Sequence, residues 1–397
     1  MRRAIITALI SIGCLSGVAA ASELIHFRDT TTSWEDVKSI AAKDHKLIII
    51  DAYTDWCSWC KVMDRETFSD PVVANFMNDK FIPVQYEMET GFGAKMSAKY
   101  RVNGFPTFLI FTPDGKLVYR ILGYMNSKDF LEKLATALDP TKQEHLAGIS
   151  ASLDPGFPEF YAQSFRKKEI RKRPDSSTVI SFLEGQKDLS AEVAWSVMFR
   201  FSSLLTAPYK DFIFKNYDKL KSLYGSNDLE STASSFLASD LNDAIKSNSE
   251  PMLDNVIASS EKYISEPAAE MRFNYRLRFY RGTQRWRAFA DLIDSAMASN
   301  DKPDPNVINS YSWTIYEQCA DKEIVARATA WMGDAVVQSP SYMLLDTYAA
   351  LLYKSGDLKK AKQYAETAIE AGKKEKQDFK ETQELLDKIN ASIEKKL

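Results

Sequence analysis

The chain has 397 residues, of which 45% are hydrophobic and 26% are charged, and its formal net charge is −3 at pH 7. This length implies two or three domains, and this composition is that of a globular protein without long disordered tracts. Nucleic-acid binding requires a basic surface that neutralises phosphates, so an acidic chain argues against a nucleic-acid partner.

The first 21 residues predict a cleaved secretory signal peptide. The chain opens with the basic sequence Met-Arg-Arg, continues with an apolar run from Ala4 to Leu15, and then offers small residues for cleavage from Val18 to Ala21. We therefore expect an exported protein, for example a periplasmic one. The residues before Cys14 fit a lipoprotein signal poorly, so we do not expect lipid anchoring there. Cleavage removes two arginines and takes the formal charge from −3 to −5.

Residues 22–140 alternate between strand and helix patterns. The apolar run from Lys46 to Tyr53 predicts a central strand that is covered on both faces. A helix is expected from Cys57 to Glu66, and Asp70 is expected to cap a helix that begins at Pro71. The other expected elements are strands over Leu24–Phe27 and Phe81–Met88, helices over Trp34–Lys43 and Ala94–Arg101, a hairpin of Thr107–Phe111 with Lys116–Leu122, and a helix from Ser127 that ends before Pro140.

The segment after the central strand carries the chemistry. Cys57 and Cys60 are separated by two residues and lie where the predicted strand passes into the predicted helix. Unpaired backbone N–H groups in the first turn of a helix stabilise a thiolate, which is the form of cysteine that attacks disulfides. The position therefore predicts Cys57 as a nucleophile, with Cys60 one helical turn behind it.

These residues resemble the thioredoxin-like family. Asp51 stands six residues before Cys57, where that family has a buried acid, and Trp56 and Lys61 flank the cysteine pair as they do in thioredoxin. The sequence Gly104-Phe105-Pro106-Thr107 is similar to the loop that carries the family's cis-proline. The resemblance covers about residues 23–140.

Two details refine the resemblance. The sequence from Thr67 to Pro71 looks like that of the C-terminal thioredoxin-like domain of membrane thiol:disulfide interchange proteins. The chain departs from thioredoxin between the cysteines, where Ser58 and Trp59 replace Gly-Pro. The resemblance to the interchange proteins favours disulfide reduction. Because residues between the cysteines help to set the redox potential, this departure leaves oxidation and isomerisation open.

The resemblance implies an α/β thioredoxin fold and an enzyme, a thiol-disulfide oxidoreductase, whose redox group is the Cys57–Cys60 pair without a bound cofactor. It implies that Cys60 resolves a mixed disulfide on Cys57, and that Asp51, buried and with a raised pKa, accepts the proton of Cys60. The residues expected to contact substrate are Trp56, Trp59, Phe105, Pro106 and Thr107.

Two partners are expected: disulfide-containing proteins, and a membrane thiol-disulfide electron carrier that recharges the pair. No metal is expected, because a zinc site needs about four nitrogen or sulfur ligands and the chain has a single close cysteine pair. Haem attachment would need histidine directly after the second cysteine, where Lys61 stands.

After Pro140 the sequence changes in character. Residues 141–175 predict a linker, with a breaker cluster from Asp154 to Pro158. The basic run from Arg166 to Arg173 is interpreted as a solvated helix face, with a patch for an acidic partner or lipid headgroups as the alternative. From Ser176 onward helical periodicity predicts an all-α domain over 176–397.

Residues 271–372 contain a spacing of 33 residues that resembles tetratricopeptide repeats, whose period is 34. A further helix pair is expected over Met271–Tyr280 and Arg285–Met297, and an irregular bundle with chance spacing is the alternative. The recurring positions are Ile315, Ala328, Trp331 and Ala335, which return as Tyr348, Ala361, Tyr364 and Ala368.

The helical domain is expected to select partners for the redox domain. The alternative is a helical-repeat adaptor whose thioredoxin-like domain has little turnover. Cys319, in an apolar part of the helical domain, is interpreted as a small buried hydrophobic residue, with a resolving or regulatory thiol as the alternative.

Overall fold

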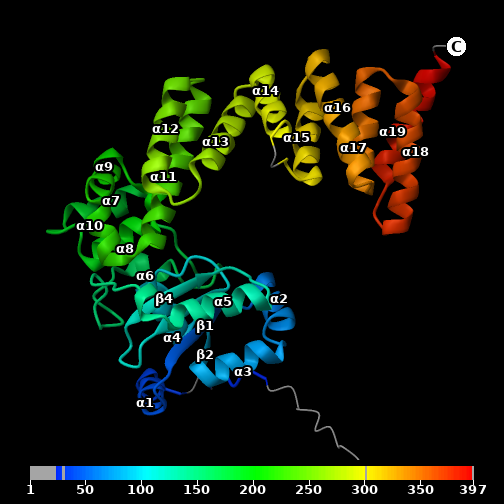
Figure 1. The fold of residues 1–397 in the computed structure, drawn as a ribbon. Coiled ribbons are helices and arrows are strands. Elements are labelled where there is room, and N and C mark those ends of the chain that lie inside the picture. Colours follow the sequence, from blue (N-terminus) through cyan, green and yellow to red (C-terminus); the bar gives the residue numbers. More distant parts are fainter. Residues whose placement is uncertain (1–23, 29–31, 300–301, 396–397) are drawn as a thin grey trace, which may run out of the picture. The chain divides into compact units, whose positions relative to one another are not determined.

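The computed structural model describes residues 24–28, 32–299 and 302–395, which form two compact units divided after Thr232 (Figure 1). The predicted signal peptide, with Cys14, lies outside the described residues.

The first unit is built on a four-stranded sheet with the order β2-β1-β3-β4. Strand β1 is parallel to β2 and antiparallel to β3, and β3 is antiparallel to β4. The strands are β1 (Leu47–Tyr53), β2 (Phe81–Glu87), β3 (Thr107–Phe111) and β4 (Leu117–Leu122). This mixed sheet, with the helices around it, confirms the predicted α/β thioredoxin fold.

The strand predicted at Leu24–Phe27 is wrong. Within the described residues, this segment contributes only an isolated bridge between Arg28 and Val84. The side chain of Asn78, and not a neighbouring strand, is the hydrogen-bond partner of this backbone. It accepts from the N–H of His26 at 2.8 Å and donates to the carbonyl of Leu24 at 3.0 Å.

Five helices cover the two faces of the sheet (Figure 1). Along β1, Ile48 and Ile50 pack with α1 and α4 on one face, and Ile49 packs with α2, α3 and α5 on the other. Successive side chains of a strand point to opposite faces, so Asp51 lies on the face of Ile49, which is the face that α2 covers. The helices are α1 (Trp34–Asp44), α2 (Ser58–Glu66), α3 (Pro71–Lys80), α4 (Gly91–Tyr100) and α5 (Ser127–Leu138).

The segment predicted as a linker, residues 141–175, packs onto this domain. It contains the short helix α6 (Glu159–Gln163) and follows the 3-10 turn η1 (Pro140–Lys142). The buried hydroxyl of Tyr161 donates to the carbonyl of Ala98 in α4 at 2.6 Å. The basic run from Arg166 to Arg173 forms turns and irregular chain, so its interpretation as a helix face is wrong.

Further helices complete the first unit, and the last of them continues into the second. They are α7 (Ser176–Glu184), α8 (Glu192–Arg200), the 3-10 turn η2 (Ser202–Leu204), α9 (Ala207–Lys215), α10 (Tyr217–Tyr224) and α11 (Ser226–Lys246). The described residues up to Thr232 form one compact unit, and the predicted domain boundary near 140 does not divide it.

Buried ion pairs join α4 to these later helices. The ammonium of Lys99 has no exposed surface and lies 2.5 Å from the carboxylate of Glu192 at the start of α8. The guanidinium of Arg101 is equally buried and lies 2.5 Å from Asp228 in α11, which also pairs with Arg120 of β4 at 2.7 Å. Charges that are removed from water must be paired, so these contacts fix the helical segment against the sheet domain.

The second unit is helical throughout its described residues. Its helices after α11 are α12 (Glu250–Tyr263), α13 (Ala268–Gly282), α14 (Trp286–Met297), α15 (Pro305–Gln318), α16 (Lys322–Gln338), α17 (Tyr342–Ser355), α18 (Leu358–Glu375) and α19 (Lys380–Glu394). Consecutive helices from α15 to α19 pack side by side. No helix in the described part of the chain is both long and apolar enough to cross a membrane.

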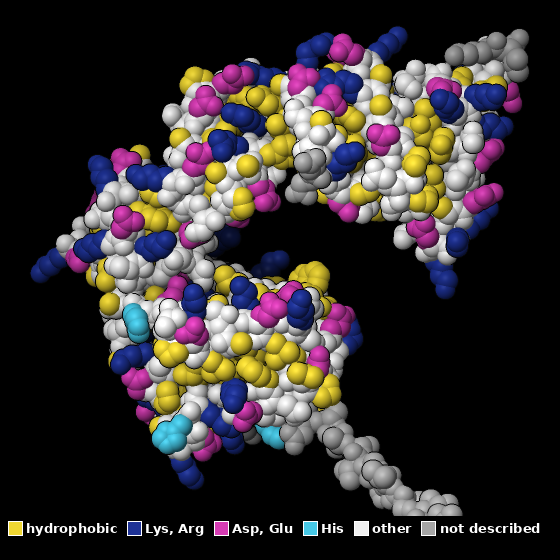
Figure 2. All heavy atoms as spheres, in the orientation of Figure 1, with side chains coloured by type: hydrophobic (Ala, Val, Ile, Leu, Met, Phe, Trp, Pro, Cys, Tyr) yellow, Lys and Arg dark blue, Asp and Glu magenta, His cyan; other side chains and the backbone are white. Residues whose placement is uncertain are grey.

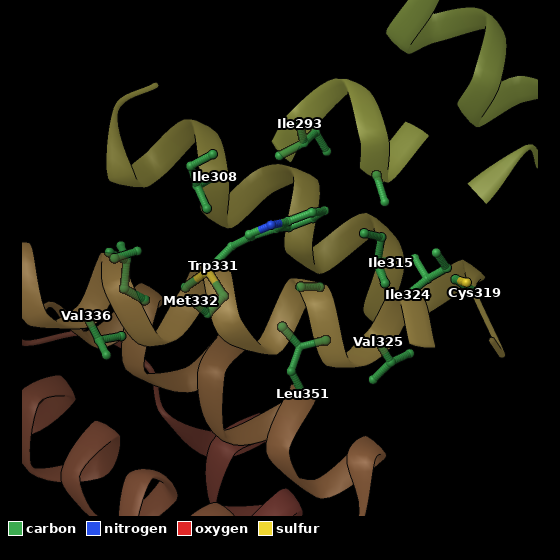
Figure 3. Close-up of a cluster of buried hydrophobic side chains, with 14 of the residues drawn as sticks. Ile293, Ile308, Ile315, Cys319, Ile324, Val325, Trp331, Met332, Val336 and Leu351 are labelled. Carbon is green, nitrogen blue, oxygen red and sulfur yellow. The ribbon is translucent and has the colours of Figure 1, made fainter. Parts of the chain in front are cut away.

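The spacing of 33 residues corresponds to successive helix pairs, α15–α16 and α17–α18. Trp331 of α16 lies among Ile293, Ile308 and Ile315 in the core (Figure 3), and its Nε1 donates to Asp294 at 2.6 Å. At the equivalent place in the next pair, the rings of Tyr348 and Tyr364 meet edge to face at 4.6 Å. Each pair therefore buries an aromatic contact between its two helices.

Cys319 is 1% exposed and lies near Ile324 at the end of α15 (Figure 3). Burial is the main cause that raises the pKa of its thiol. The prediction of a small buried hydrophobic residue is confirmed.

On the drawn faces of both units, Lys and Arg side chains lie interspersed with Asp and Glu side chains (Figure 2).

We predict that Asp228→Asn destabilises the first unit by about 3–5 kcal/mol, because Arg101 and Arg120 would remain buried without their counter-charge. Chemical unfolding of the full chain measures this loss. Asp218→Asn, an exposed position on α10, is the matched control. A loss below about 1 kcal/mol for Asp228→Asn, the usual range of exposed pairs, would contradict the structural role of this cluster.

Candidate active site

Cys57 and Cys60 form a disulfide at the start of α2. Cys57 is the N-cap residue of the helix, and its sulfur accepts from the N–H of Cys60 at 3.0 Å. The two residues are 4% and 6% exposed, so only a small part of the disulfide reaches the surface. The unpaired N–H groups at the helix start would stabilise the thiolate of Cys57 after reduction.

Two exposed tryptophans border the disulfide. Trp56 is 65% exposed and Trp59 is 57% exposed, although both are large apolar side chains. Trp56 lies edge-on to Phe105 at 6.0 Å between ring centroids, and Trp59 lies against Tyr124 at 5.4 Å. Exposed aromatic groups that gather around a reactive group are typical of a docking surface.

The loop before β3 completes the rim. The peptide bond between Phe105 and Pro106 is cis, as the resemblance predicts. The Thr107 hydroxyl donates to the carbonyl of Gly104 at 2.7 Å, and Thr107 pairs with Ala52 near the end of β1. This pairing brings the loop to the end of the strand that leads into the cysteine pair. The predicted site residues Trp56 and Phe105 are therefore in contact. Pro106 and Thr107 follow Phe105 directly, at the end of the loop and the start of β3.

Asp51 lies in β1 on the face covered by α2 and is 3% exposed. Burial raises its pKa to about 7, a hydrogen bond from Gln85 at 2.9 Å opposes this rise, and the negative charge of Asp64 in α2 adds to it. Its carboxyl group can therefore gain or lose a proton near neutral pH. The sequence-predicted acid thus has the burial and the pKa that its predicted role requires.

Three residues of the site, Glu89, Arg171 and Lys167, are absent from the predicted site residues. Glu89, 4% exposed, accepts from Nε1 of Trp56 at 2.9 Å and pairs with Arg171 at 2.6 Å. Lys167 pairs with Asp55 at 3.0 Å. The basic run thus contacts the active-site turn directly at Asp55 and, through Glu89, at Trp56. The run itself was visible in the sequence, but its partners lie 82 and 112 residues away, and no pattern connects them.

The disulfide is the redox-active candidate in this site. Among the residues that the structure describes, no group of three or more His, Cys, Asp or Glu side chains is placed to hold a metal ion.

Residues 34–138 match the family model described as a thioredoxin-like domain. The chain is 31% identical over 114 residues to the thiol:disulfide interchange protein DsbD of Photorhabdus laumondii, which covers 28% of this chain and 20% of that protein. It is 32% identical over 99 residues to DsbD of Pectobacterium atrosepticum, covering 24% and 17%. The chain thus spans about one fifth of the length of these curated relatives.

Two solved structures are similar over the same domain. The oxidised C-terminal domain of Neisseria meningitidis DsbD matches at 24% identity and a TM-score of 0.25, covering 28% of this chain and 97% of that domain. A putative disulphide-isomerase from Bacteroides thetaiotaomicron matches at 30% identity and a TM-score of 0.28, covering 30% and 98%. The family match over residues 34–138 shows a thioredoxin-like domain, as the sequence predicts, and a helical region follows it in the chain.

The raised pKa of Asp51 makes the stability of the oxidised protein depend on pH. The folded state holds the proton more tightly than the unfolded chain, so this stabilisation is fully present below about pH 3.8 and is lost as the pH rises through about 7. Between pH 5 and pH 8 the loss is about 3 kcal/mol, and Asp51→Asn should not show it. Denaturant unfolding of both proteins at the two pH values measures the difference. Parallel pH dependences would show that Asp51 does not titrate near neutrality.

Proposed function

We propose that this protein is an exported thiol-disulfide oxidoreductase that reduces disulfides in other proteins through Cys57 and Cys60. The observation that carries the proposal is the disulfide at the start of α2, bordered by two exposed tryptophans and supported by a buried Asp51 whose pKa is about 7. The relatives named thiol:disulfide interchange proteins match this domain, which supports the same chemistry.

In the first step, the Cys57 thiolate of the reduced protein attacks one sulfur of a substrate disulfide. A bond forms between Cys57 and that sulfur, and the other substrate sulfur leaves as a thiolate. Cys57 suits this role because its sulfur accepts the N–H of Cys60, a contact that favours the thiolate.

In the second step, Cys60 resolves the mixed disulfide. Its thiol proton passes to the Asp51 carboxylate, and the resulting thiolate attacks the sulfur of Cys57. The substrate leaves with its second sulfur as a thiolate, and the Cys57–Cys60 disulfide forms again. Two electrons have moved from the cysteine pair to the substrate, so each cycle needs a reductant.

Substrate would bind as an extended chain beside Phe105. Within the described part of the chain, no backbone hydrogen bond involves the N–H or the carbonyl of Phe105, so both groups can pair with a bound chain. The exposed side chains of Trp56 and Trp59, next to the cysteines in the chain, provide apolar contacts. Pro106 and Thr107 set the direction of this loop through their contacts with Gly123 and Gly104.

The reductant that we propose is a membrane thiol-disulfide electron carrier. The second unit, with its tetratricopeptide-like helix pairs, would select the protein partner, since stacked helix pairs commonly present an extended binding surface. A helical adaptor with little turnover is the competing function, and the trapping experiment below separates the two.

We predict that Cys57→Ser abolishes exchange with a model disulfide. Cys60→Ser should instead accumulate lasting mixed disulfides on Cys57, because no second thiol resolves them. Non-reducing gel electrophoresis and mass spectrometry of trapped partners measure this, and Cys319→Ser, a buried position in the second unit, is the control. Absence of adducts on Cys60→Ser, together with no exchange by the wild type, would favour the adaptor.

We also predict that resolution of the mixed disulfide becomes faster as the pH rises through about 7, because the Asp51 carboxylate must be ionised to accept a proton. Asp51→Asn should remove this titration and slow resolution by about 10²–10⁴-fold. Rapid-quench kinetics with a preformed adduct on Cys57 measures the rate. An unchanged rate and pH profile in Asp51→Asn would remove Asp51 from the mechanism.

A further inference from the structure

A polar pocket of the first unit opens beside the tryptophan and the cis-proline loop of the active site. It lies where the turn after α4, the basic run and the end of α8 come together. The lining residues that matter here are Trp56, Glu89, Asn103, Phe105, Arg171 and Arg200. Two of them, Trp56 and Phe105, also form the rim on which we place the substrate chain.

Arg200, the last residue of α8, brings a positive charge into this pocket. Its guanidinium donates to the hydroxyl of Ser164 at 3.0 Å, to the carbonyl of Ser164 at 2.5 Å and to the side-chain oxygen of Asn103. Its flat face lies over the ring of Phe165, 4.2 Å from the centroid. These contacts hold the guanidinium rigidly through neutral groups only.

Arg200 has no carboxylate partner among the described residues, whereas the other arginine of the pocket has one. Glu89 is the buried carboxylate of the pocket, and its two oxygens are taken by Trp56 and Arg171. The pKa of Arg200 is lowered to about 10, mainly by burial; Tyr161 opposes this shift, and the charges of Arg171 and Arg173 add to it. At neutral pH the group still carries its charge, so the pocket keeps one uncompensated cation.

A partly buried cation without a counter-charge is stabilised by any carboxylate that can reach it. A guanidinium offers paired N–H donors that match the two oxygens of a carboxylate. Three of the five N–H groups of Arg200 are used in the contacts above, which leaves donors for a ligand. Arg200 and Phe105 line the same pocket, and the substrate chain is proposed to bind beside Phe105. A carboxylate that reaches Arg200 would therefore belong to the substrate polypeptide whose disulfide Cys57 attacks.

We propose that this pocket binds an acidic side chain, Asp or Glu, of the substrate polypeptide, close in sequence to the cysteine that Cys57 attacks. The proposal rests on the function proposed above and adds a substrate class to it. Arg200 is then a specificity residue for acidic segments, Arg171 neutralises Glu89, and Glu89 holds the indole of Trp56 at the pocket edge.

The test uses disulfide peptides that carry Glu or Gln at successive positions on either side of one cysteine. At one or more positions, wild-type protein should reduce the Glu peptide with a kcat/KM about tenfold higher than the Gln peptide, which is a usual size for one charge-assisted hydrogen bond. Arg200→Gln should bring that ratio to about one, and Arg200→Lys should keep part of it. Arg173→Gln removes a nearby exposed charge and should retain the ratio.

The ratio between two peptides on one protein separates recognition from folding. If Arg200→Gln lowers the rate for both peptides equally, Arg200 has only a structural role and the inference is overturned. Equal rates for Glu and Gln peptides at every position with wild-type protein would overturn it as well.

A binding measurement keeps this inference distinct from the proposed reaction. The full chain with both Cys57→Ser and Cys60→Ser is titrated calorimetrically with the same two peptides. Preference for the Glu peptide without any turnover by the wild type would support the pocket and remove the proposed reductase function. Turnover by the wild type with no preference in binding would retain the reductase and overturn the acidic pocket.

Discussion

The burial of two cations at the C-terminal end of α4 is the constraint on which the first unit depends. Lys99 and Arg101 have no exposed side-chain surface, and such groups are tolerated only with partners. Their partners, Glu192 and Asp228, lie more than 90 residues further along the chain. Folding of the sheet domain in this form therefore requires the helical segment that follows it, and residues 141–232 become part of the domain.

This packing also determines what surrounds the redox site. Once α8 and α11 are held against α4, the chain between α6 and α7 passes beside the active-site turn, where Arg171 meets Glu89 and Lys167 meets Asp55. The helical addition thus acts on the immediate surroundings of Trp56. It does so through the ion pairs of Lys167 and Arg171. The sheet domain holds the cysteine pair itself, because β1 leads directly into the start of α2.

The positions of the Cys57–Cys60 disulfide and of Asp51 follow from the sequence because their signals are local. The apolar run before Cys57 and Cys60 predicts β1, and their spacing predicts the start of α2. The alternation of side chains along β1 then puts Asp51 on the sheet face that α2 covers, so no distant contact is needed to predict its place. The strand expected at Leu24–Phe27 fails for the opposite reason, since the Asn78 side chain bonds that backbone. The packing of residues 141–175 and the irregular course of the basic run do not follow from the sequence, because their partners lie on distant elements that charge and periodicity do not reveal.

The central claim is that the Cys57–Cys60 pair delivers electrons to substrate disulfides. Its equilibrium redox potential tests this most directly, measured by equilibrating the full chain in thiol-disulfide buffers and quantifying the free cysteines by alkylation and mass spectrometry. We expect a potential near that of reducing members of the fold, about −270 mV. A value near about −120 mV, typical of a strong oxidant, would contradict it.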